Sequence, residues 1–135
     1  MNSHLKFHHF GLAVRRQEQA AAFVRALGYK IGDAVFDPEQ NVHLAMCSHA
    51  TEPALELIWP GEGKGPIDTL VQRHASGIIY HTCYETDDLE AALSALTAQG
   101  INAVCVSPRK PAVLFNGRKV SFYNVVGMGL IEIVE

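Results

Sequence analysis

The chain contains the same pair of residue types twice, in the same order and each time within an apolar stretch. His9 lies in F-H-H-F-G-L-A-V and Glu56 in A-L-E-L-I-W, and His81 then lies in I-I-Y-H-T-C-Y and Glu132 in G-L-I-E-I-V. The histidines are 72 residues apart (81 minus 9) and the glutamates 76 (132 minus 56). The sequence therefore indicates two similar halves, each with one imidazole and one carboxylate.

The paired residues indicate a metal site. An ionised glutamate among Leu, Ile and Trp is costly to bury unless a positive group meets it. Two such glutamates, each with a matching histidine, favour a four-ligand site made by His9, Glu56, His81 and Glu132. Two imidazoles and two carboxylates suit a single divalent ion, Zn, Ni, Co, Mn or Fe, and do not distinguish among these metals.

Hydrophobic periodicity predicts the same order of elements in each half: a strand, a helix and three further strands. In the first half these are residues 5–14, the helix 17–27 ended by Gly28, and 29–36, 42–47 and 55–59. In the second half they are 78–86, the helix 89–99 ended by Gly100, and 102–107, 118–124 and 130–134. G-E-G-K-G-P and a short helix, 67–74, link the halves, and the loop P-R-K-P-A-V-L-F-N-G precedes the penultimate strand.

The predicted fold is α+β, with two paired βαβββ modules at about 5–60 and 77–135 in one domain, 1–135. The histidines lie on the first strand of each module and the glutamates on the last. If the modules pack side by side about a pseudo-twofold axis, the four side chains can converge on one concave face.

Composition narrows the function classes. A chain of 135 residues, 48% hydrophobic and 19% charged, can bury a substantial core. A net charge of -3 and a pI near 6.1 give no electrostatic case for nucleic acid or an anionic membrane, so a small molecule is the expected partner.

No apolar signal-peptide segment precedes residue 10 and no apolar run is long enough to span a membrane, so we expect an unprocessed, soluble protein. Three widely spaced cysteines without C-x-x-C argue against disulfides and thiolate zinc, and favour a cytoplasmic location.

The motifs H-H-F-G-L-A-V, L-E-L-I-W-P, G-I-I-Y-H-T-C-Y-E and G-L-I-E-I-V-E, in this order, resemble the vicinal oxygen chelate (glyoxalase/bleomycin resistance) superfamily. Within it the resemblance is greatest to the methylmalonyl-CoA epimerase family, followed by the glyoxalase I family. The resemblance implies a curved mixed sheet around a metal-binding cup. It assigns His9, His81 and Glu132 to the epimerase metal positions and Glu56 to the fourth ligand of glyoxalase I.

The resemblance also implies an activity. It predicts a metal-dependent epimerase or isomerase that removes an α-proton next to a carbonyl through a metal-stabilised enolate. Glu39, in D-P-E-Q-N-V, aligns with a glutamate proposed for proton transfer in the epimerases, and Glu132 would act near the reacting carbon as well as binding metal. The expected substrate is a small carbonyl compound, with a CoA thioester as one candidate, and fold-level analogy predicts a homodimer.

Two other functions remain open. One is glyoxalase I-type lyase chemistry, and the other is non-catalytic binding of a small molecule or drug on the same fold. The region before the final strand carries A-V-L-F-N-G in place of the usual epimerase turn, which leaves the substrate open. The basic cluster Arg109, Lys110, Arg118 and Lys119 either binds a substrate anion or forms a solvated face. Leu114 and Phe115 either cover the pocket or pack within their loop.

Overall fold

The computed structural model describes residues 3–135 and divides them into two compact units. The N-terminal unit is His9–Tyr80, and the C-terminal unit combines residues 3–8 with His81–Glu135. The strand β1 (Lys6–Ala13) and the strand β6 (Ile78–Glu85) therefore each contribute residues to both units.

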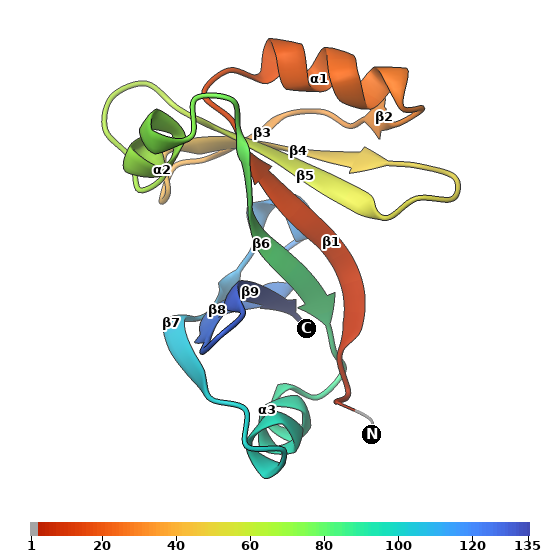
Figure 1. The fold of residues 1–135 in the computed structure, drawn as a ribbon, viewed down its shortest axis with the longest axis vertical. Helices are drawn as coiled ribbons and strands as arrows, with labels where there is room; N and C mark the ends of the chain where they lie inside the picture. Colours follow the sequence, from red (N-terminus) through yellow and green to blue (C-terminus); the bar gives the residue numbers. More distant parts are fainter. Residues whose placement is uncertain (1–2) are drawn as a thin grey trace. The chain divides into compact units, whose positions relative to one another are not determined.

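The N-terminal unit is a small sheet with one helix on its face. Its strands lie in the order β2-β4-β5-β1, and β3 pairs with β4. β1 runs parallel to β5, and the other pairings are antiparallel. Figure 1 shows α1 over β4 and β5. Beyond β1 the elements are α1 (Gln17–Ala26), β2 (Lys30–Ile31), β3 (Val35–Asp37), β4 (Val42–Ser48), β5 (Ala54–Pro60) and α2 (Asp68–Arg73).

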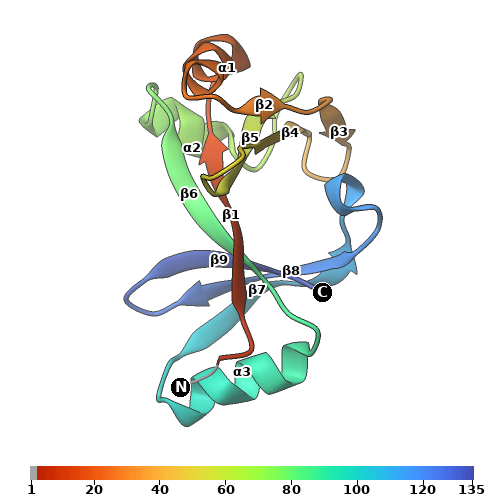
Figure 2. The same cartoon turned by 90° about the vertical axis from the view of Figure 1, so that its right-hand side faces the viewer.

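The C-terminal unit repeats this plan with the strand order β6-β9-β8-β7. β6 runs parallel to β9, and β9, β8 and β7 pair antiparallel. The helix that lies against this sheet begins after Asp88, whose carboxylate accepts the backbone N–H of Ala91 at 3.0 Å (Figure 2). After β6 the elements are α3 (Leu89–Ala98), β7 (Ala103–Pro111), the short 3-10 helix η1 (Val113–Phe115), β8 (Lys119–Val125) and β9 (Gly129–Val134).

Strand alternation decides which side chains the helices cover. In β5, Leu55 and Leu57 face α1 and pack in one core with Ala21 and Val24, so Glu56 between them faces the opposite side of the sheet. The C-terminal unit follows the same rule. Ile131 and Ile133 of β9 pack with Leu89 of α3, and Val134 packs with Cys83 and Val120 in a separate cluster. Glu132, which has the parity of Val134, therefore lies on the face away from α3.

These elements confirm the predicted α+β fold and the βαβββ order of each half. Both predicted helix stops are correct, because Gly28 (φ 96°) and Gly100 (φ 76°) follow α1 and α3 in the left-handed region that glycine tolerates. Among residues 3–135, no helix has the length and apolar character needed to cross a bilayer.

Two predictions of local structure were wrong. The strand expected at 29–36 is two short strands, because the register with β4 shifts by one residue between Ile31, which pairs with Cys47, and Val35, which pairs with Leu44. The segment Pro108–Pro111, expected in a loop, belongs to β7. Prolines are tolerated there because β7 is the last strand of its sheet and its register with β8 shifts on either side of Ser107.

Candidate metal centre

The N-terminal unit brings His9 and Glu56 together on the sheet face away from α1. Gly11 of β1 is the register partner of Glu56 of β5, and His9, two residues earlier, shares the face of Gly11. His9 Nε2 and Glu56 Oε2 are 3.8 Å apart, and the two side chains are 0% and 5% exposed. These two residues therefore form one buried pair.

The C-terminal unit brings His81 and Glu132 together in the same way. Cys83 of β6 is the register partner of Glu132 of β9, and His81 precedes Cys83 by two residues. His81 Nε2 and Glu132 Oε1 are 3.5 Å apart, with side chains 1% and 7% exposed. Phe122 of β8 is the other register partner of Glu132, and its ring meets the His81 ring edge-on at 5.7 Å.

The two pairs match in register as well as in residue type. In each unit the residue two positions after the histidine is paired with the glutamate across a parallel ladder. The repeat seen in the sequence is therefore a repeat of local geometry, and each unit supplies one imidazole nitrogen and one carboxylate oxygen from a buried face.

The distances within each pair fit a shared metal ion. An N–H···O hydrogen bond spans roughly 2.7–3.2 Å, whereas 3.5 Å and 3.8 Å separate the nitrogen and oxygen atoms here. A nitrogen and an oxygen bound at about 2.0–2.2 Å to one tetrahedral ion lie roughly 3.4 Å apart. The donor types, the burial and the spacing of these residues are therefore compatible with coordination of a divalent ion.

The predicted base, Glu39, lies in a different part of the N-terminal unit. It is an exposed residue of the turn between β3 and β4, and its backbone N–H donates to Asp37 Oδ1 at 3.0 Å. The turn leads into Val42, which pairs with Pro60, four residues beyond Glu56 along β5. The assignment of Glu39 as a base stays a prediction.

The basic cluster is largely paired with carboxylates of the same unit. Arg109 binds Glu135 at 2.7 Å and Glu90 at 2.9 Å, and hydrogen bonds to these two carboxylates raise the pKa of Arg109. Arg118 lies 3.4 Å from Glu85 Oε2 and donates from Nε to the backbone carbonyl of Glu135 at 2.8 Å. The contacts of Arg109 join β7 to α3 and to Glu135, and those of Arg118 join the start of β8 to β6 and to Glu135, which favours a structural role for these two arginines over substrate binding.

Sequence reasoning left the role of Phe115 open and missed the packing of Phe122 beside the second pair. Phe115 and Phe122 pack against the cluster of Cys83, Val120 and Val134. Phe115 is therefore a packed residue of the C-terminal unit. The alternation of Val120 and Phe122 along β8 was the available signal, because both residues share the face of their register partners, Val134 and Glu132.

Comparison with known proteins gives the family. Residues 8–122 match the model of the glyoxalase/bleomycin resistance protein/dioxygenase superfamily. Because this match covers most of the chain, the protein belongs to that superfamily, which confirms the resemblance drawn from the four motifs.

Several relatives of this chain are epimerases. The ethylmalonyl-CoA/methylmalonyl-CoA epimerase of Cereibacter sphaeroides is 31% identical over 119 residues, which cover 87% of this chain and 86% of the relative. The crystal structure of methylmalonyl-CoA epimerase from Mycobacterium tuberculosis matches with a TM-score of 0.76 at 20% identity, over 96% of this chain and 86% of that one. A methylmalonyl-CoA epimerase in complex with methylmalonyl-CoA and NH4+ matches with a TM-score of 0.71 at 20% identity, over 96% and 93% of the chains. The structural matches show a shared fold.

Proposed function

We propose that this protein is a metal-dependent epimerase that removes and returns a proton on the carbon next to the carbonyl of a CoA thioester. The observation that carries the proposal is the pair of matched, buried His–Glu contacts at 3.8 Å and 3.5 Å. The relation to an ethylmalonyl-CoA/methylmalonyl-CoA epimerase supports the reaction class, and the relative crystallised with methylmalonyl-CoA supports the substrate class.

His9, Glu56, His81 and Glu132 are the proposed ligands of one divalent ion, which is Zn, Ni, Co, Mn or Fe. A buried carboxylate is stabilised by a nearby cation, and the register of both pairs gives each unit one nitrogen and one oxygen donor. A divalent ion held there would act as a Lewis acid toward the substrate carbonyl, which makes the neighbouring carbon more acidic.

The protein's own groups would handle the proton and exclude water. Glu39 is the proposed base, and the hydrogen bond from its N–H to Asp37 fixes the backbone of the turn that carries it. A base must come within about 2.6–3.2 Å of its proton-transfer partner, directly or through one water molecule. Glu132 is proposed both as a metal ligand and as a catalytic residue near the reacting carbon. Phe122, edge-on to His81, gives this side of the site an apolar wall.

We also propose a cytoplasmic homodimer. The three cysteines are widely spaced and form no C-x-x-C motif, which supports a reducing compartment. The dimer rests on fold-level analogy with the family. Light scattering that gives a mass near 14.8 kDa at tens of micromolar would refute it.

Metal analysis of the purified protein tests the site. The wild type should carry about one divalent ion per chain, and His9→Ala and His81→Ala should lose it, because the remaining ligands cannot complete the coordination shell. His74→Ala is the matched control, since His74 is an exposed histidine at the end of α2. A stable wild-type protein that takes up no divalent ion would overturn the proposal. Retention of metal in Glu56→Ala alone would reduce the ligand set to three.

A further inference from the structure

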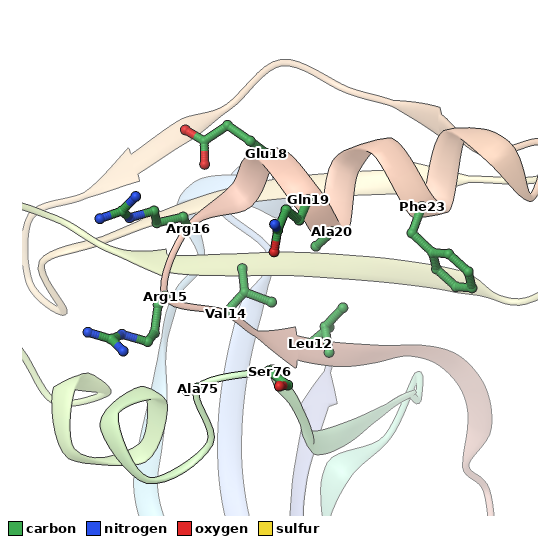
Figure 3. A pocket seen from close by; sticks show the side chains of 11 residues that line it. Leu12, Val14, Arg15, Arg16, Glu18, Gln19, Ala20, Phe23, Ala75 and Ser76 are labelled. Atoms are coloured by element: carbon green, nitrogen blue, oxygen red, sulfur yellow. The ribbon is translucent and has the colours of Figure 1, made fainter.

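A pocket lies in the N-terminal unit, between the start of α1 and the segment that leads into β6 (Figure 3). Its volume is about 700 Å³, within the roughly 300–1,000 Å³ range of small-molecule sites. Leu12, Val14, Ala20 and Phe23 form its apolar wall, and Ser76 lines it from the segment before β6.

This pocket is separate from the candidate metal centre. Leu12 pairs with Leu57, whose side chain packs under α1, whereas Gly11 pairs with Glu56. Adjacent strand residues point to opposite faces, so Leu12 and Val14 face away from the side on which His9 and Glu56 meet. A ligand in this pocket would therefore occupy different residues from a substrate bound at the His–Glu pair.

The lining of the pocket includes two arginines that contribute no ion pair to the fold of the described residues. Arg15 and Arg16 line it and are exposed, and none of the ion pairs among residues 3–135 involves either of them. Both guanidinium groups lie on the same side of the pocket in Figure 3, opposite Phe23, and Glu18, the acidic residue in the lining, extends toward that side as well. Arg109 in the C-terminal unit, by contrast, already binds two carboxylates.

Phe23 gives the pocket an exposed aromatic side chain. It is a large apolar side chain that is 65% exposed, on the helix that forms one wall. An exposed aromatic ring beside a cavity can contribute apolar contact area to a ligand, while an arginine fork can bind a carboxylate or phosphate through two parallel hydrogen bonds. The lining is therefore complementary to a molecule with an apolar body and an anionic end.

We propose that this pocket binds a small amphipathic anion. Its acyl or aryl body would lie against Leu12, Val14 and Phe23, and its carboxylate or phosphate would bind Arg15 and Arg16. The two headgroups share this chemistry, and octanoate and octyl phosphate are probes that distinguish them.

Calorimetric titration of the full chain with octanoate, octyl phosphate and neutral octanol tests the proposal. We expect saturable binding of at least one anion, with changes in amide resonances at Val14, Ser76 and Gly77. The double variant Arg15→Ala with Arg16→Ala should weaken anion binding at least tenfold and change octanol binding less than twofold. Arg25→Ala, in α1 but outside the lining, should leave both unchanged.

A second variant keeps the test independent of the arginines. Ser76→Trp places a large side chain in the exposed loop at the pocket and should abolish binding of all three probes. The proposal is overturned if neither anion saturates, if the double arginine variant binds as tightly as the wild type, or if resonance changes lie outside the pocket. None of these readouts depends on metal or on enzymatic activity, so the result stands apart from the epimerase proposal.

Discussion

Replacing Glu132 with Gln should preserve the stability of the metal-free protein but reduce the stabilisation that metal binding provides. The Glu132 side chain is 7% exposed, and its carboxylate lies 3.5 Å from His81 Nε2. An ionised carboxylate in such a place costs several kcal/mol to desolvate, and glutamine keeps the shape without the charge. We therefore expect the metal-free variant to be at least as stable as the metal-free wild type.

The response to metal should fall in the variant. With a dissociation constant of about 1 µM, about 100 µM metal stabilises the folded state by about 2.7 kcal/mol. The entropy of unfolding is about 0.28 kcal/mol per kelvin for a chain of 135 residues, so Tm should rise by about 10 °C in the wild type. A hundredfold loss of affinity leaves about 0.4 kcal/mol and a shift of only about 1.5 °C.

Thermal unfolding followed by circular dichroism, after chelation and after metal addition, measures both effects. Glu62→Gln is the control, because Glu62 is exposed in the loop after β5. Two results would refute the reasoning. In one, Glu132→Gln keeps the full metal-induced rise in Tm. In the other, the free energy of unfolding of the metal-free variant falls by about 3–5 kcal/mol, as expected when a buried charge pair that only stabilises the fold is broken.

Three further predictions concern the two units. Leu57→Ala should lower the free energy of unfolding by about 3–5 kcal/mol in urea, because Leu57 is completely buried, and a loss under about 1 kcal/mol would contradict the assigned core. Iodoacetamide at about pH 8 should label Cys105 first in the native protein, because Cys105 is exposed. Burial raises the pKa of the Cys47 thiol to about 11, so Cys47 should react more slowly. Mass spectrometry showing Cys47 labelled first would contradict this. Arg109→Ala should lower the stability only slightly, and that effect should disappear in 1 M NaCl, because the ion pair of Arg109 with Glu135 is partly exposed; a large, salt-independent loss would point to another role.

Periodicity predicted the placement of the metal-binding candidates well, because their positions follow from local rules. Once Leu55 and Leu57 are assigned to the helix-covered face, Glu56 must face the other way, and the same alternation places Glu132. The apolar neighbours and the repeated His–Glu order were therefore enough to predict both pairs. The elements also followed from local signals, such as the glycine after each helix.

Features that depend on tertiary contacts could not be read from the sequence. The break in the strand expected at 29–36 depends on a one-residue shift in its register with β4, and the extension of β7 through Pro111 depends on its position at the sheet edge. The pairing of Arg109 with Glu135 joins residues 26 positions apart. No periodicity in the sequence specifies such a partner.

Solvent exchange at the substrate's α-carbon is the most direct test of the proposed function. The metal-loaded protein should incorporate deuterium from D₂O into methylmalonyl-CoA, and removal of metal or Glu132→Gln should reduce the rate sharply. Glu39→Gln should slow exchange but keep the metal. Failure of the metal-loaded wild type to exchange the proton would contradict the epimerase account. Rapid conversion of a glutathione hemithioacetal by the same sample would replace it with a glyoxalase I-type lyase, and binding of either compound without change would identify a binding protein.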